Sequence, residues 1–174
     1  MDIEVERRVL DQPVQAAGFN PRLHVVLVEP EIAANVGAIG RTCVALGAHL
    51  WLVRPLGFHL DDRRRRRAGL DYWDDLCLHV VDDLAQALSE SGAPHAWYFS
   101  THATRLFYEV SFGPGDALVF GPESRGLPSF LLAANPEQAV RLPMMPLVRS
   151  LNLGSSVAVG LFEAARQIGF GDAV

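Results

Sequence analysis

Four segments of this chain of 174 residues combine charged or polar side chains with glycine and proline in patterns that could do chemistry. The first runs from Glu29 to Arg41 and contains two glycines, Gly37 and Gly40, within a helical pattern. An arginine two turns into a helix that starts where a strand ends can reach a phosphate or hydroxyl group of a bound molecule. The alternative is a helix capped by Asn35, with glycines that allow close packing on a sheet. Taken alone, this segment favours the alternative.

The second segment runs from Phe120 to Pro128 and holds two glycines and two prolines, which fix an unusual backbone path. It also carries two charged residues, Glu123 and Arg125. A tight turn requires glycine and proline, but it does not require this pair of charges. A functional role is therefore at least as well supported as a purely structural one.

The third segment runs from Arg141 to Leu153; its centre is apolar and contains two prolines, and it ends in Ser150 and Asn152 before a helical pattern. Capping of that helix accounts for one of these two polar residues. It does not account for an apolar loop stiffened by proline. Such a loop suits a flat hydrophobic ring that receives hydrogen bonds from main-chain groups, as adenine does.

The fourth segment contains five consecutive arginines flanked by aromatic residues. The arginines are Arg63, Arg64, Arg65, Arg66 and Arg67, and the aromatic residues are Phe58, Tyr72 and Trp73. A charged surface exposed to solvent is the usual explanation of such a run, but five like charges repel and need counter-charges. Arginine next to aromatic rings can hold the phosphates and bases of RNA. We favour RNA contact over solvation.

The overall composition fits one globular domain, because hydrophobic residues make up 49% of the chain and charged residues 20%. The net charge of −5 argues against a nucleic-acid partner, but the charge is unevenly distributed. From Arg41 to Arg67 seven arginines stand against two aspartates, whereas residues 71–90 contain six acids and no arginine. A local basic patch is what would meet phosphate.

Other classes of site and of location are not indicated. Only two cysteines occur, Cys43 and Cys77, and the six histidines show no metal-ligand spacing, so we expect neither disulfides nor a metal site. No apolar run approaches the ~20 residues that cross a bilayer, and the N-terminus lacks the pattern of a secretory signal. We expect a cytoplasmic protein that does not enter a membrane.

Alternating apolar runs and helical periods must position the four segments. The expected strands are Leu23–Val28, His49–Val53, Leu76–Val81, Ala96–Thr101, Ala117–Phe120 and Ala139–Leu142. The expected helices are Asn35–Leu46, Asp82–Ser89, Pro128–Ala134 and about Leu153–Ile168. This order predicts an α/β fold with a mainly parallel sheet flanked by helices. Ligands in such folds lie beyond the carboxyl ends of the strands, and the four segments occupy four such loops, those after Val28, Val53, Phe120 and Leu142.

The joint occurrence of these segments resembles the SPOUT class of RNA methyltransferases. The resemblance rests on Asn35-x-Gly37-x-Ile39-x-Arg41, on Gly121-Pro122-Glu123-x-x-Gly126-Leu127, and on Leu142-Pro143-Met144 followed by Ser150-Leu151-Asn152, in that order. Within the class, Glu29-Pro30-Glu31-Ile32, Pro55-Leu56-Gly57-Phe58 and the stretch from Asp61 to Tyr72 resemble the tRNA wobble-nucleotide (cytidine/uridine-34) 2′-O-methyltransferases.

The resemblance implies a single domain over residues 23–170 with a C-terminal trefoil knot, preceded by an extension of unknown role (1–22) and followed by a short tail (171–174). It implies S-adenosylmethionine as methyl donor, no metal, the tRNA anticodon stem-loop as substrate, and a homodimer formed through the C-terminal helix. Arg41 is then expected near the methyl-accepting hydroxyl. The residues expected to bind the cofactor are Phe99, Gly121, Leu142, Met144 and Ser150.

Three residues depart from the pattern of this family. Gly154 stands where relatives usually have serine, Phe162 where some have tyrosine, and His102 where a lysine can occur. These departures bear on substrate contacts more than on the reaction. Two alternatives stay open: methylation of another tRNA or rRNA site, and a non-catalytic protein of the same fold that binds RNA or cofactor.

Overall fold

The computed structural model describes residues 22–59 and 72–169, and it contains a seven-stranded sheet in the order β3-β2-β1-β6-β4-β7-β5. Each strand pair in this described part of the chain is parallel. The strands are β1 (His24–Val28), β2 (His49–Val53), β3 (Leu78–Val81), β4 (Ala96–Phe99), β5 (Arg105–Leu106), β6 (Ala117–Phe120) and β7 (Ala139–Arg141). The α/β fold with a parallel sheet is thus confirmed, and the six expected strands are all present.

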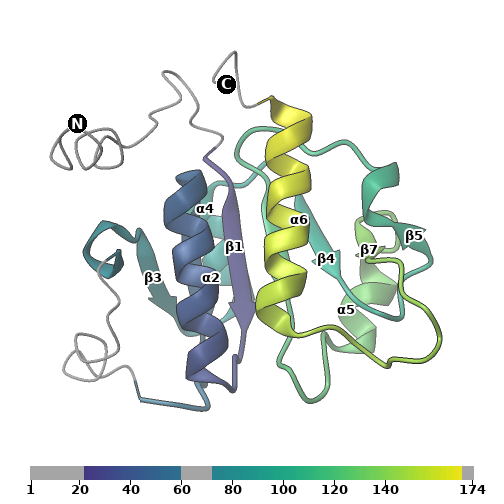
Figure 1. Cartoon of the computed structure of the whole chain (residues 1–174), viewed down its shortest axis with the longest axis horizontal. Coiled ribbons are helices and arrows are strands. Elements are labelled where there is room, and N and C mark those ends of the chain that lie inside the picture. The colour runs from purple at the N-terminus through teal and green to yellow at the C-terminus, as the bar shows by residue number, and fades with distance from the viewer. Residues whose placement is uncertain (1–21, 60–71, 170–174) are drawn as a thin grey trace, which may run out of the picture.

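Helices cover both faces of the sheet (Figure 1). They are α2 (Ala33–Leu46), α4 (Leu84–Ser91), α5 (Ser129–Ala134) and α6 (Leu153–Ile168), with short 3₁₀ turns η1 (Trp73–Asp75) and η2 (Phe107–Glu109). The core on one face includes residues of α2 and α6, and the core on the other includes residues of α4 and α5. Alternate residues of β1 and β6 point to opposite cores, as the pleat of a strand requires.

Local sequence accounts for the end of α2 and for the start of α4, but not for the start of α2. Gly47 ends α2 with a φ of +64°, and Asp83 begins α4 by accepting a hydrogen bond from the Gln86 amide. The expectation that Asn35 caps α2 is wrong: the helix already begins at Ala33, and the capping residue Ile32 has no side-chain acceptor. The amide group of Asn35 is used elsewhere.

The first three segments singled out from sequence meet at the carboxyl edge of the sheet. The loops after β1, β4, β6 and β7 leave the sheet at this edge, and both α2 and α6 begin there, side by side (Figure 1). No helix in residues 22–59 and 72–169 is long and apolar enough to span a bilayer.

Candidate functional site

A cavity of about 670 Å³ lies at the carboxyl edge of the sheet, a volume usual for small-molecule sites. Its walls come from the loops after β1, β4, β6 and β7 and from the first turns of α2 and α6. The structure brings together all five residues that were expected to bind the cofactor. They are Phe99, Gly121, Leu142, Met144 and Ser150.

One wall of the cavity is apolar and is backed by two aromatic rings that are buried in the core. The rings of Phe99 and Phe120 stack with centroids 4.5 Å apart and an interplanar angle of 20°. Behind them, a Cβ on Gly160 of α6 would come within 3.0 Å of the Phe99 ring, so this glycine lets the helix approach the ring closely. Leu142 and Met144 are half-buried on the loop after β7. The wall therefore combines apolar surface with main-chain groups at the ends of strands.

The loop after β6 folds back tightly on itself at Gly121. A Cβ on Gly121 would lie 2.3 Å from the carbonyl carbon of Gly126 and 2.4 Å from the amide nitrogen of Leu127. The loop closes through a hydrogen bond from the Gly126 amide to the Pro122 carbonyl, and Gly126 itself has a φ of +68°. Both glycines of this segment are thus required by the backbone path.

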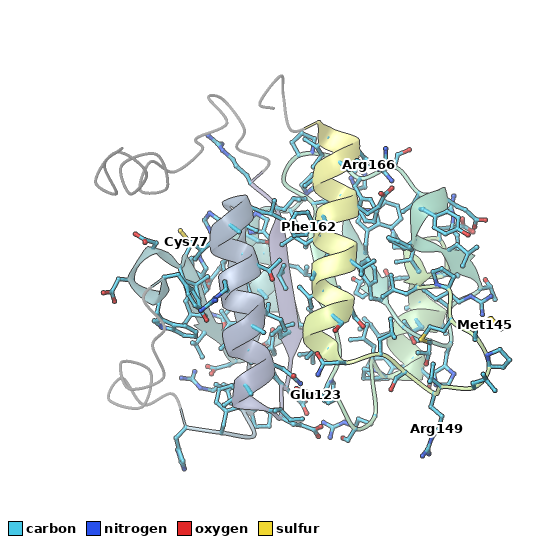
Figure 2. All side chains as sticks on the ribbon, viewed as in Figure 1. Cys77, Glu123, Met145, Arg149, Phe162 and Arg166 are labelled. Atoms are coloured by element: carbon cyan, nitrogen blue, oxygen red, sulfur yellow. The ribbon has the colours of Figure 1, made fainter. Side chains whose placement is uncertain are left out.

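Glu123 joins this loop to the start of α2 (Figure 2). Its carboxylate accepts hydrogen bonds from the backbone amides of Glu31 and Ile32 and from the side-chain amide of Asn35. Glu123 thereby satisfies free amides beside the first turn of α2, and its negative charge is favourable beside the positive end of the helix. The carboxylate supplies from a distant loop the cap that the local sequence lacks.

Asn35 and Asn152 complete the network. The side-chain nitrogen of Asn152 donates to the side-chain oxygen of Asn35, and the side-chain oxygen of Asn152 accepts from the backbone amide of Ser155. Asn152 is therefore the capping residue of α6, and the polar residue of the third segment that capping explains. Ser150 is exposed on the cavity wall.

A second set of contacts fastens the loop after β6 to the loop after β1. The hydroxyl and backbone amide of Ser124 donate to the Glu31 carboxylate at 2.6 and 2.9 Å, and Arg125 pairs with Glu29. The hydrogen bonds from Ser124, with a smaller contribution from Arg125, hold the pKa of Glu31 below its usual value. Arg125 and Glu123 thus serve different contacts and do not form a charge pair with each other.

Arg41 is placed differently from the cofactor residues. It is exposed on α2, does not line the cavity, and its guanidinium carbon lies 4.9 Å from the centre of the Tyr72 ring. Gly37 and Gly40, expected to pack on the sheet, face the segment that contains Tyr72 and Trp73 instead. Arg63 to Arg67 lie outside the described residues.

Several cavity residues were not singled out for the cofactor from sequence. Arg149, which directly precedes Ser150, lines the cavity. His102, one of the departures from the family pattern, lines it as well.

Gly154 is buried where α6 meets α2: a Cβ there would lie 3.1 Å from the Asn152 side-chain oxygen. In the described part of the chain no group of three metal-ligating side chains occurs. Burial raises the pKa of the Cys43 thiol to about 12.

Comparison with known proteins identifies relatives that match most of the chain. A protein of Burkholderia cenocepacia named tRNA (cytidine(34)-2′-O)-methyltransferase is 51% identical over 150 residues, which are 84% of this chain and 96% of that protein. A solved structure described as giving insights into the 2-OH methylation of C/U34 on tRNA is 45% identical, has a TM-score of 0.77, and matches 86% of this chain and 98% of its own.

A more distant structure shows the fold alone. It is the SpoU methyltransferase AviRb from Streptomyces viridochromogenes in complex with the cofactor AdoMet, which is 23% identical with a TM-score of 0.73 over 87% of this chain and 60% of its own. The family model of the SpoU rRNA Methylase family matches residues 22–162. Since that match covers most of the chain, the protein belongs to the SpoU rRNA Methylase family.

Proposed function

We propose that this protein is an S-adenosylmethionine-dependent methyltransferase that modifies the ribose 2′-hydroxyl of the tRNA wobble nucleotide, cytidine or uridine 34. The observation that carries the proposal is the cavity at the carboxyl edge, where four loops far apart in the sequence bring the five expected residues together. The names of relatives about half identical over nearly their whole length support the choice of substrate.

The cavity fits an adenosine-containing cofactor. The side chains of Leu142 and Met144 offer apolar surface for a flat base, and main-chain groups at Gly121 and Ser150 can provide hydrogen bonds. When bound, S-adenosylmethionine supplies a methyl group on a positively charged sulfur, which is electrophilic without help from a metal.

Arg41 is the proposed catalytic residue. A ribose hydroxyl is a poor nucleophile at neutral pH, and negative charge develops on its oxygen as the hydroxyl loses its proton to solvent and becomes able to attack the methyl carbon. A guanidinium group near that oxygen stabilises the developing charge. Residues 22–59 and 72–169 contain no carboxylate that pairs with Arg41, so its positive charge is not neutralised by an ion pair within them.

The remaining features follow from the same proposal. Arg63 to Arg67 would contact the phosphates of the anticodon stem-loop. A tRNA substrate is consistent with an enzyme of the cytoplasm. A trefoil knot is supported by the path of the third segment, which returns from β7 to the start of α2 through Asn152.

A homodimer through α6 is supported by Val159 and Phe162, which are large, apolar, and 45% and 49% exposed.

Methyl transfer from labelled S-adenosylmethionine to bulk tRNA that lacks wobble methylation tests the proposal, with nucleoside mapping of the product. We expect label on the ribose of nucleotide 34. Label at another tRNA position, or on rRNA as the family description would allow, would overturn the proposed substrate. Cofactor binding without transfer to any RNA would favour the non-catalytic alternative.

The role of Arg41 is tested separately from the substrate. Arg41→Ala should nearly abolish turnover and leave the affinity for S-adenosylmethionine unchanged, because the residue does not line the cavity. Arg105→Ala is the matched control, since Arg105 lies on the edge strand β5 away from the cavity. Turnover of Arg41→Ala at the level of the control would show that Arg41 has another role.

A further inference from the structure

Tyr72 contacts the turn of α2 that carries Arg41 at two points. The guanidinium carbon of Arg41 lies over its ring, 4.9 Å from the centroid, and its hydroxyl donates a hydrogen bond of 2.6 Å to the Gly37 carbonyl. Gly37 precedes Arg41 by four residues, which is one turn of helix. The hydroxyl of Tyr72 therefore fixes this side chain to the backbone of the turn, and the ring of Tyr72 lies under the guanidinium of Arg41.

Of the two glycines in the Asn-x-Gly-x-Ile-Gly-Arg stretch, Gly40 makes room for this arrangement. A Cβ on Gly40 would lie 3.1 Å from Leu76, 3.4 Å from Trp73 and 3.6 Å from Tyr72. A Cβ on Gly37 would lie 3.9 Å from the Tyr72 hydroxyl. The glycine at position 40 in particular lets residues 72–76 lie directly against α2.

An aromatic ring suits a guanidinium that must act on something else. A carboxylate partner would neutralise the charge of Arg41 and occupy its N–H donors. The face of a ring attracts the cation and leaves the N–H donors, which point outward in the guanidinium plane, available for an oxygen ligand. The contact with Tyr72 thus restricts the orientation of the Arg41 side chain and leaves its positive charge and its N–H donors available.

We propose that Tyr72 is a positioning residue for methyl transfer, acting through Arg41. The inference rests on the proposed role of Arg41. Tyr72 does not line the cofactor cavity, so its replacement should change the rate of transfer and leave cofactor affinity unchanged. The ring carries the effect on Arg41, and the hydroxyl holds the ring on α2.

The test compares variants that remove the ring with one that keeps it. Tyr72→Leu should lower kcat for methyl transfer roughly three- to thirtyfold, the range expected when a cation–π interaction is removed. Tyr72→Phe should stay within about two- to threefold of the unchanged protein, because only a hydrogen bond is removed. Tyr72→Met is a second variant without a ring and should match Tyr72→Leu. Tyr108→Leu, at an exposed tyrosine, is the control.

Other results would overturn the inference. Equal losses in Tyr72→Phe and Tyr72→Leu would exclude a role for the ring, and a raised KM for tRNA at unchanged kcat would mean that Tyr72 acts on RNA directly. In single-turnover assays, Tyr72→Leu should cause no further loss in the Arg41→Ala background. Full activity of Arg41→Ala would instead refute the proposed role of Arg41, whereas full activity of Tyr72→Leu alongside an inactive Arg41→Ala would refute only this inference.

Discussion

The side-chain nitrogen of Asn152 lies 2.9 Å from the side-chain oxygen of Asn35 and donates a hydrogen bond to it, although 117 positions separate the two residues. The bond joins the first turn of α6 to the first turn of α2. Because Asn35 also donates to Glu123, the loops after β1, β6 and β7 depend on one buried amide group. The shape of the cavity therefore depends on a network that no single loop contains.

Removal of the Asn35 amide should loosen all three loops. Asn35→Ala removes one of the two donors to a Glu123 oxygen and leaves the Asn152 nitrogen without its partner, and we expect a decrease of about 1–3 kcal/mol in the free energy of unfolding. Affinity for S-adenosylmethionine should fall as well. Urea denaturation and calorimetric titration measure the two effects. Asn135→Ala is the control, because the Asn135 side chain bonds only locally, to the Leu131 carbonyl; equal behaviour of the two variants would contradict the expectation.

A single methyl group at Gly121 should disrupt the cavity. In Gly121→Ala the new Cβ would meet the backbone of Gly126 and Leu127, which no rotation of a side chain can relieve, so the loop has to open. We expect cofactor binding to be abolished while circular dichroism still shows the helices and the sheet. Gly113→Ala is matched to it, since a Cβ there would meet only the Asp116 carboxylate, at 3.9 Å. Normal affinity of Gly121→Ala would mean that this loop does not shape the binding site.

Much of this architecture could be predicted from sequence because it depends on local patterns. Apolar runs marked six strands, and the period of apolar residues gave α6 its observed bounds. The strand β5 was missed because two residues, one of them an exposed arginine, show no period. The loops could be recognised as unusual from glycine, proline and charge, and they meet because parallel strands end at one edge.

The pairings between the loops could not be predicted in the same way. Asn35 has the residue type of a helix cap, and only the tertiary structure shows that Glu123 takes over that task from 88 positions away. Likewise, Gly37 and Gly40 appeared suited to packing on a sheet, whereas the tertiary fold brings Tyr72 and Trp73 against them. Local sequence determines what a side chain can do, but distant segments determine which partner it meets.

The five arginines are expected to govern the salt dependence of tRNA binding. Replacement of Arg63 to Arg67 by glutamine should weaken binding and lower the slope of log affinity against log salt by roughly 0.7 to 0.9 for each phosphate that an arginine no longer neutralises. Filter binding from low to moderate salt measures the slope. Replacement of the same residues by lysine keeps the charge and should keep most of the slope. An unchanged slope in the glutamine variant would show that the five arginines form a solvated surface and do not contact phosphates of the tRNA.

Three histidines at the start of the sheet form a cluster that should make stability sensitive to acid. His24 of β1 is buried and lies beside His49 of β2, and His79 of β3 stacks on Trp51 with centroids 3.9 Å apart. The Trp51 ring nitrogen donates to Nδ1 of His24 at 3.0 Å, which requires that nitrogen to be unprotonated. Burial, with smaller contributions from His49 and His79, lowers the pKa of His24 to about 4.

The free energy of unfolding should therefore decrease as the pH falls from about 6.5 towards about 4. In that window the unfolded chain takes up a proton at His24 that the folded chain excludes, and below it both states are protonated, so the decrease ends. A shift from 6.5 to about 4 corresponds to a decrease on the order of 3 kcal/mol. Urea denaturation at several pH values measures the slope. His24→Asn, which keeps an acceptor for Trp51, should show a shallower slope, while His59→Asn, at an exposed position, should behave as the unchanged protein does. The same slope in all three proteins would show that acid sensitivity arises outside this cluster.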